Sequence, residues 1–136
     1  MIPYCILRNT QHVIVWSDMI YHITTRRDWD AEQSKGEYAA PSLATEGFIH
    51  CSTLSQVLPV AENFYKGQTG LILLVIDPTL LSSTLNWEPP SGEPPPGVSE
   101  SETFPHIYGP INVNAVTKTV DLETNADGTF ILPPNL

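Results

Sequence analysis

The stretch "GFIHCS", residues 47–52, decides how the chain folds, because it sets a histidine, a cysteine and a serine inside an apolar run. Successive side chains of a β-strand point to opposite faces, so a strand here turns His50 and Ser52 to one side and Cys51 to the other. His50 and Cys51 then cannot meet as base and nucleophile. We therefore interpret Cys51 as a core residue, and His50 and Ser52 as parts of a polar cleft.

Two further segments repeat the pattern of a histidine followed two residues later by a hydroxyl. In "YHIT" the pair is His22 and Thr24. In "HIYG" it is His106 and Tyr108, which share a face if the segment is extended. Each histidine alone is more often a hydrogen-bonded structural residue, but three such strands together predict a shared cleft. Imidazoles and hydroxyls in a cleft can bind ribose hydroxyls or exchange protons near neutral pH.

Two main helices are expected, both in the first half of the chain. Thr25 is a typical N-cap and predicts a helix over residues 25–36, with Trp29 on its buried face. A second helix is predicted over residues 53–67. Pro59 should divide it into a short first turn and a main segment, with a kink between them.

Six or seven strands are expected, mostly after the helices. The extended segments are residues 19–24, 47–52, 71–76, 84–89, 104–111, 115–123 and 127–133, the last two joined by a turn. "LILLVI", residues 71–76, lacks alternation and predicts a strand covered on both faces. With helices early and strands late, the sequence predicts an α+β fold rather than a doubly wound sheet.

Length, charge and cysteine usage limit the possible functions. The 136 residues suit one domain, which we place at residues 19–136. Six basic against 15 acidic residues give a net charge of -9, which disfavours long nucleic acids but leaves room for a small ligand held locally. Cys5 and Cys51 lack disulfide or zinc spacing. No apolar run approaches the roughly 20 residues of a membrane helix, so we expect no membrane segment and, by default, a cytoplasmic protein.

Residues 89–103 form a compositionally distinct segment. They contain five prolines, three glutamates and no lysine or arginine. Such a composition buries too little apolar surface to order itself, which predicts a mobile surface loop. A lid over the cleft is the alternative, since lids also exclude water from reactions, but a plain insertion is favoured.

Several blocks of the sequence resemble one protein family. "IYHITTRRDWDAEQ", "EGFIHCS" and "FPHIYGP" are similar to the bacterial domain-of-unknown-function 952 family, over about Met19 to Phe130. Members have a fold like the ADP-ribosyltransferases, two small packed β-sheets with helices on their flanks, and no established activity. The resemblance begins near Met19. We therefore expect residues 1–18 to be an extension outside the domain, and translation to begin naturally at Met19.

The resemblance also implies roles for individual residues. His22 corresponds to the first-strand histidine that holds the adenosine ribose of NAD in many ADP-ribosyltransferases. "HCST" resembles the block that shapes the nicotinamide pocket, which implies a binding role for Ser52 and Thr53. The glutamate that stabilises the ribosyl cation has no match, because "HIYGP" stands in its place. Glu46 or Glu123 could replace it only if the fold brings one of them into the cleft.

Together these observations predict a cleft for NAD or a related nucleotide that transfers ADP-ribose or acts at the ribose. The catalytic residues expected are His50, His106 and Glu46. The cofactor-binding residues expected are His22, Thr24, Ser52, Thr53 and Tyr108.

Two other functions remain open at this point. A domain that kept the cleft and lost the acid would be a non-catalytic ligand-binding or interaction module. Three imidazoles can also bind zinc and leave a coordination position open. The sequence lacks short ligand spacing and an "HExxH" motif, so we assign no metal ligand and expect no metal. It makes no prediction of the oligomeric state.

Overall fold

The computed structural model describes residues 19–134 and 136. The predicted extension over residues 1–18, with Cys5, lies outside the described residues, and the start at Met19 stays a prediction. In chain order the elements are β1 (Ile20–Thr25), α1 (Arg26–Gln33), β2 (Glu37–Tyr38), α2 (Pro41–Glu46), β3 (Ile49–His50), α3 (Leu54–Phe64), β4 (Leu71–Ile76), η2 (Pro78–Leu80), β5 (Thr84–Glu88), β6 (Phe104–Tyr108), β7 (Ile111–Asn112), η3 (Val113–Ala115) and β8 (Val116–Asp121). No helix in the described part of the chain is long and apolar enough to cross a membrane.

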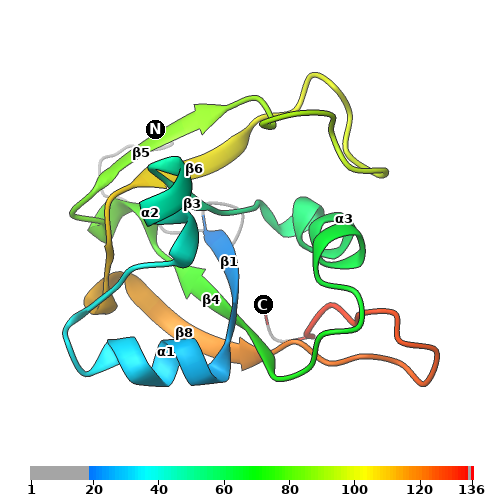
Figure 1. Ribbon diagram of the computed structural model, residues 1–136, viewed down its shortest axis with the longest axis horizontal. Helices are drawn as coiled ribbons and strands as arrows, with labels where there is room; N and C mark the ends of the chain where they lie inside the picture. Colours follow the sequence, from blue (N-terminus) through cyan, green and yellow to red (C-terminus); the bar gives the residue numbers. More distant parts are fainter. Residues whose placement is uncertain (1–18, 135) are drawn as a thin grey trace, which may run out of the picture.

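The strands form three small antiparallel sheets, with strand orders β1-β4-β8, β3-β6-β5 and β2-β7. Figure 1 shows β1 and β4 in the middle of the molecule, β5 and β6 above them, α1 below and α3 to one side. The predicted α+β class is therefore confirmed. The expected two sheets are wrong, because the two-residue strands β2 and β7 pair as a third sheet that their alternation was too short to reveal.

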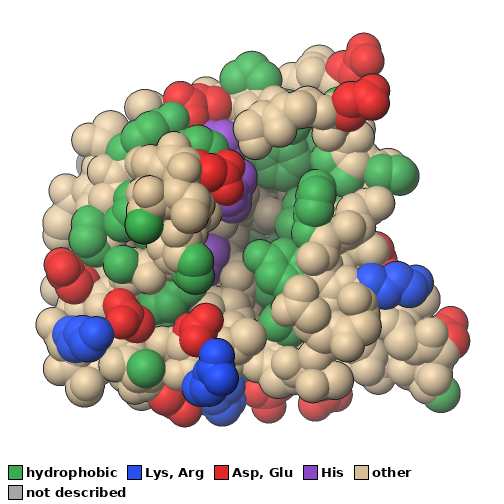
Figure 2. All heavy atoms as spheres, in the orientation of Figure 1, with side chains coloured by type: hydrophobic (Ala, Val, Ile, Leu, Met, Phe, Trp, Pro, Cys, Tyr) green, Lys and Arg blue, Asp and Glu red, His purple; other side chains and the backbone are tan. Residues whose placement is uncertain are grey.

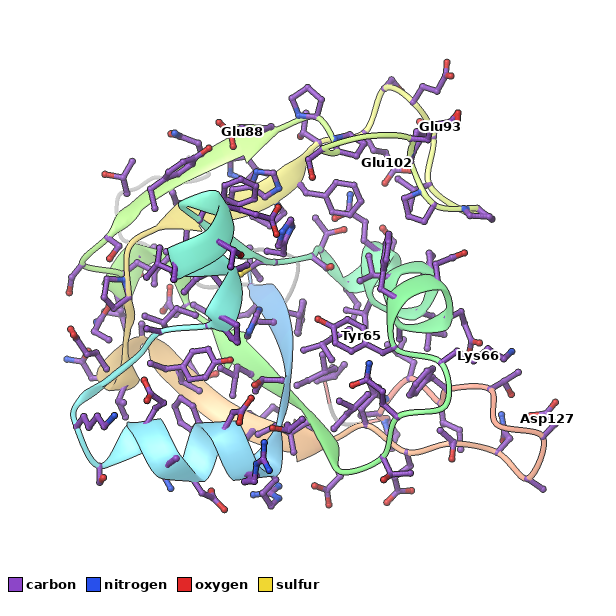
Figure 3. The ribbon with its side chains drawn as sticks, viewed as in Figure 1. Tyr65, Lys66, Glu88, Glu93, Glu102 and Asp127 are labelled. Carbon is purple, nitrogen blue, oxygen red and sulfur yellow. The ribbon has the colours of Figure 1, made fainter. Side chains whose placement is uncertain are left out.

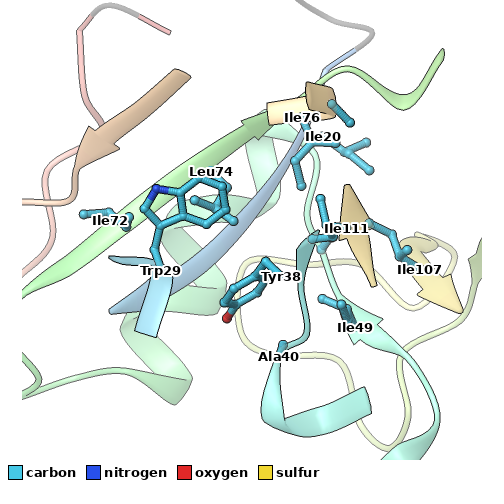
Figure 4. Packing of buried hydrophobic residues seen from close by; sticks show 12 residues of the cluster. Ile20, Trp29, Tyr38, Ala40, Ile49, Ile72, Leu74, Ile76, Ile107 and Ile111 are labelled. Carbon is cyan, nitrogen blue, oxygen red and sulfur yellow. The ribbon is translucent and has the colours of Figure 1, made fainter. Parts of the chain in front are cut away.

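Strand β4 is the centre of the core, as its lack of alternation predicted. All six of its residues are buried. Its even-numbered side chains pack in one cluster with Trp29 and Tyr38 (Figure 4). Its odd-numbered side chains pack on the other face with Val57 and Ala61 of α3. It is also the central strand of its sheet, with β1 on one edge and β8 on the other.

The sequence predicted where the helices begin better than where they end. Thr25 caps α1 by accepting a hydrogen bond from the backbone N–H of Asp28, and Trp29 is buried, as expected. Helix α3 runs unbroken across Pro59 and ends at Phe64, so the predicted division and the end near residue 67 are wrong. A proline removes one backbone hydrogen bond, and the packing of α3 on β4 outweighs that loss.

A third helix, α2, went unpredicted, and the last expected strand does not form. Pro41 begins α2 and Gly47, with φ of 89°, ends it, which is the usual placing of proline and glycine at helix ends. At only six residues the helix has no clear apolar period. Residues 127–133 contribute a single bridge between Thr124 and Phe130, closed by the expected turn, and no strand.

The stretch from residue 47 to 52 joins the two three-stranded sheets. Ile49 and His50 pair with β6, and the backbone N–H of Cys51 donates to the carbonyl of Pro105. One residue later, Ser52 exchanges two backbone hydrogen bonds with Tyr21 of β1, at 2.8 and 2.9 Å. The predicted strand is thus only two residues long, because the chain leaves one sheet for the other within it.

His22 strengthens this junction from the other face of β1. Its Nδ1–H donates to the carbonyl oxygen of His50 at 2.6 Å. Its Nε2 lies 3.3 Å from the hydroxyl of Tyr38, which in turn lies 2.7 Å from the hydroxyl of Thr24. Burial among these uncharged partners lowers the pKa of His22 to about 4. The imidazole is therefore neutral at pH 7 and ties three strands together.

We predict that this histidine makes the fold sensitive to acid. Between the unfolded pKa of 6.5 and the folded value of about 4, the unfolded chain binds a proton that the folded chain does not. Stability is therefore full above the unfolded pKa and falls as the pH drops toward the folded one, by about 3 kcal/mol from this residue. Urea unfolding at a series of pH values should show that loss in the wild type but not in His22→Gln.

A matched variant separates this effect from general acid lability. His50→Gln removes a half-exposed imidazole and should leave the acid sensitivity of the wild type in place. An equal loss of stability with falling pH in the wild type and in His22→Gln would contradict the role given to His22.

Candidate functional site

A pocket of about 380 Å³ lies between the junction, α3 and the segment over residues 89–103. Figure 2 shows histidine side chains in a hollow of this face, with hydrophobic side chains across from them. The polar wall consists of Glu46, His50, Ser52 and His106. The apolar wall includes residues of β1, α3 and β6, namely Ile23, Val60, Phe64, Tyr65 and Phe104. The pocket therefore offers hydrogen bonds on one side and an apolar surface on the other, as small-ligand sites commonly do.

The structure brings together half of the residues expected at the site. All three expected catalytic residues and Ser52 line the pocket. His22 and Thr24 do not, because β1 turns them to its other face, against Tyr38. Thr53 is the N-cap of α3, where its backbone N–H donates to the Gln56 side chain.

His50 is paired with an acid from the end of α2. Its Nε2 lies 3.1 Å from each carboxylate oxygen of Glu46. The two side chains are about half exposed, at 45% and 44%, so water screens the pair and its contribution to stability is small. Glu46 owes its position to the left-handed Gly47, which ends α2 and leads directly into β3.

His106 is paired with a second acid, Glu88, that sequence analysis missed. The Nδ1 of His106 lies 2.7 Å from Oε1 of Glu88, and the hydroxyl of Tyr108 donates to the same oxygen at 2.6 Å. Figure 3 labels Glu88 on β5, next to β6. The hydrogen bond from Tyr108, followed by that from His106, lowers the pKa of Glu88.

The charge on Glu88 fixes the tautomer of the imidazole. An ionised carboxylate only accepts hydrogen bonds, so the Nδ1 of His106 carries its proton. In the neutral ring the lone pair then lies on Nε2. His106 is nearly buried, with 4% of its side chain exposed, and it lines the pocket. This is the arrangement in which an imidazole can take a proton from a bound ligand.

Aromatic packing holds the two imidazoles in place. His50 and His106 are direct partners across β3 and β6, with ring centroids 5.5 Å apart. Phe48 stacks on His106 at 4.2 Å and meets the edge of His50 at 4.8 Å. Each imidazole thus has a carboxylate partner and a shared aromatic neighbour, which limits both rings to one orientation.

The cysteine of the opening stretch belongs to the core, as predicted. Cys51 is 3% exposed, packs with the β4 cluster and also touches the pocket wall. Burial raises its pKa far above the ordinary value, so the thiol stays protonated and is a poor nucleophile. Glu123 lies in a separate shallow depression near the end of β8 and does not line the pocket.

The segment over residues 89–103 forms one wall of the pocket. Pro90, Ser91, Glu93 and Pro95 line it. The segment is attached to α3 by Gln56, whose Nε2 donates to Glu102 and to the carbonyl of Thr103 at 3.1 and 3.0 Å. It is thus a structural part of the site, and its mobility stays a prediction.

The described residues contain no cluster of side chains suited to hold a metal ion. Within residues 19–134 and 136, no three His, Cys, Asp or Glu side chains are grouped closely enough to ligate one ion. His22 lies on the face of β1 that points away from the pocket, whereas His50 and His106 line the pocket.

We predict that Tyr108 controls the charge of Glu88. Tyr108→Phe removes the stronger of the two hydrogen bonds to this carboxylate and should raise its pKa toward the ordinary value. A carbon-detected NMR titration of the glutamate carboxyl groups measures the change directly. Glu102, whose pKa is lowered by Ser99 and Gln56, should titrate identically in both proteins, and an unmoved Glu88 would show that the Tyr108 hydrogen bond is absent in solution.

We predict that Gln56 holds the pocket wall against α3. Gln56→Met keeps the volume but removes the side-chain hydrogen bonds to the backbone N–H of Thr53 and to the carbonyl of Thr103, which should cost about 1–3 kcal/mol, at about 0.5–1.5 kcal/mol for each bond. Cleavage after Glu93 or Glu100 by a glutamate-specific protease should also become faster. Gln33→Met, on the exposed face of α1, is the matched control, and cleavage of both variants at the wild-type rate would contradict the attachment.

Comparison with known proteins places the chain in a family. The model of the family described as "Protein of unknown function (DUF952)" matches residues 23–119. The crystal structure of protein CC0527 from Caulobacter crescentus is 34% identical, with a TM-score of 0.71 over 84% of this chain and 94% of that one. The solution NMR structure of CC0527 is 33% identical, with a TM-score of 0.68 over 88% and 97%. No curated protein matches. The resemblance drawn from the sequence is thus confirmed, and the chain belongs to the DUF952 family.

Proposed function

We propose that the pocket binds NAD or a related nucleoside by its nicotinamide riboside end, and that His106 acts there as a general base. The observation that carries this proposal is the Glu88–His106 pair, which leaves the Nε2 of His106 for a ligand in a pocket with an apolar wall. The proposal includes an ADP-ribosyltransferase-like fold. Two three-stranded sheets joined at residues 50–52, with helices on their flanks, are consistent with it.

The polar wall suits a sugar. His50, Ser52 and His106 present ring nitrogens and a hydroxyl from adjacent backbone segments, and such groups pair with ribose hydroxyls. Among the described residues no lysine or arginine lines the pocket, whereas Glu46 does. This charge favours the cationic nicotinamide ring of NAD over its pyrophosphate, which would stay at the pocket mouth.

The same charge favours chemistry at the ribose. When the bond between C1′ and the nicotinamide nitrogen breaks, its electron pair moves to the ring and positive charge develops on the sugar. Glu46 is the acid on the polar wall beside that charge. The hydroxyl of an acceptor would give its proton to Nε2 of His106 as its oxygen bonds to C1′. Tyr108 acts through Glu88 as a positioning residue.

This assignment differs from the one that the family resemblance implied. His22 is 6% exposed and both of its ring nitrogens have partners in the fold. We therefore give the ribose contact to His50 and His106. Thr24 and Thr53 have structural partners of their own and take no part in the proposal.

A non-catalytic binding module is the second candidate. The observation in its favour is the exposure of Glu46, because a carboxylate that is 44% exposed and paired with His50 stabilises a developing cation less than a buried one. This candidate shares the binding site and differs only in the absence of turnover.

We predict that NAD and nicotinamide riboside bind to the wild type in isothermal titration calorimetry. His106→Gln should weaken binding about tenfold, the value of one or two lost hydrogen bonds, and reduce any nicotinamide release by about 100-fold or more. His22→Gln, once shown to be folded by circular dichroism, should bind as the wild type does. Release of nicotinamide, measured by chromatography, separates the two candidates.

The opposite pattern would overturn the assignment. Binding lost in His22→Gln and kept in His106→Gln would place the ligand on the other face of β1. A wild type that binds neither compound at millimolar concentration would exclude both candidates for these ligands.

A further inference from the structure

The hydroxyl of Tyr21 has no partner in the free protein. Tyr21 is 1% exposed, and its hydroxyl oxygen is the one buried side-chain nitrogen or oxygen of residues 19–134 and 136 that makes no hydrogen bond. A buried hydroxyl without a partner destabilises a fold relative to a phenylalanine ring of the same shape. Such an atom in a protein needs an explanation, and a missing ligand is one.

Tyr21 belongs to the pocket wall. It lies on the face of β1 opposite His22 and packs with Val57 and Ala61 of α3. Tyr21 and its strand neighbour Ile23 both line the pocket. The backbone of Tyr21 is bonded to Ser52, which also lines it. Because Tyr21 is almost fully buried and still lines the pocket, we place its unpartnered hydroxyl at the buried end of the site.

The chemistry of the hydroxyl and its surroundings defines what it would bind. Burial raises the pKa of Tyr21, so the hydroxyl keeps its proton at neutral pH and donates it. A ligand oxygen that accepts this hydrogen bond would satisfy the hydroxyl. With Glu46 and Glu93 among the lining residues and no lysine or arginine among those described, an anionic oxygen is disfavoured. An uncharged carbonyl oxygen meets both conditions.

The rest of the buried end is apolar and aromatic. Ile23, Val60 and Tyr65 belong to the same apolar cluster as Tyr21 and also line the pocket, as does Phe104. These side chains pack against a flat ring but offer few polar groups. The acceptor oxygen must therefore be a single group on an otherwise apolar part of the ligand.

We propose that the buried end of the pocket recognises a ring that carries an uncharged carboxamide, and that the hydroxyl of Tyr21 donates a hydrogen bond to its carbonyl oxygen. The inference rests on the proposed function and names the part of the ligand that enters first. It makes Tyr21 the residue that selects a ring with a carbonyl oxygen over a bare ring, whereas the acidic lining disfavours a carboxylate in the same place.

Three ribosides test the inference against Tyr21→Phe. Nicotinamide riboside carries the carboxamide, nicotinic acid riboside carries a carboxylate, and pyridine riboside carries neither. By ligand-observed NMR, the wild type should bind the first about fivefold to tenfold more tightly than either of the others. Tyr21→Phe should lose the preference over pyridine riboside, which it should bind as the wild type does, and should keep the preference over nicotinic acid riboside, which the acidic lining sets.

Stability measurements distinguish a binding role from a structural one. Tyr21→Phe removes an unpartnered group, so its melting temperature should equal or exceed that of the wild type. Tyr38→Phe is the matched control, because the hydroxyl of Tyr38 has partners in Thr24 and His22. That variant should melt at a lower temperature and keep the preference for the carboxamide.

Each outcome bears on one of the two proposals. If Tyr21→Phe keeps the preference for nicotinamide riboside over pyridine riboside, or melts lower as Tyr38→Phe does, the inference is wrong while the pocket and its acid–base pair stand. If His106→Gln also leaves riboside binding unchanged, the proposed function fails as well. If the wild type binds none of the three ribosides, both proposals are overturned.

Discussion

The fold depends on one backbone crossing, where three consecutive residues serve two sheets. His50 pairs with β6, Cys51 donates to the carbonyl of Pro105, and Ser52 pairs with Tyr21. The sheets β1-β4-β8 and β3-β6-β5 share no strand, and this crossing joins them by backbone hydrogen bonds. Because backbone hydrogen bonds are obligatory in a buried strand, the crossing also fixes the register of every side chain on the polar wall. The pocket is a consequence of how the two sheets are joined.

The features of the fold and site that could be predicted from the sequence are those that depend on residues close together in the chain. The N-cap at Thr25, the doubly buried β4 and the separate faces of His50 and Cys51 depend on residues close in sequence, and all agree with the structure. Glu88 was missed because 17 residues stand between it and His106. Alternation in "TLNWEP" does place Glu88 on one strand face, but which strand lies beside it is a tertiary fact.

The short helices and strands could not be predicted from the sequence, for a related reason. Strands β2 and β7 are two residues long, and α2 is six, so none of them contains a full period of its pattern. They exist because longer neighbours position them. The segment over residues 89–103 is a further case in which local sequence is not enough. Its proline-rich composition predicted a loop without firm contacts to the rest of the fold, whereas Gln56 attaches it to α3. Composition describes what a segment can do alone and not what a neighbour does to it.

Two histidines in this small fold show how surroundings decide a role that sequence cannot. His22 has a carbonyl and a hydroxyl as partners and is fully buried, so only its neutral form is stable and its pKa falls to about 4. His106 is almost as buried but has the carboxylate of Glu88 at Nδ1, which leaves Nε2 as the accepting nitrogen of the neutral ring. A neutral partner makes a histidine structural, whereas a carboxylate partner lets it take part in proton transfer. The same residue type, in the same pattern with a hydroxyl two residues on, therefore builds the junction in one strand and the polar wall of the pocket in another.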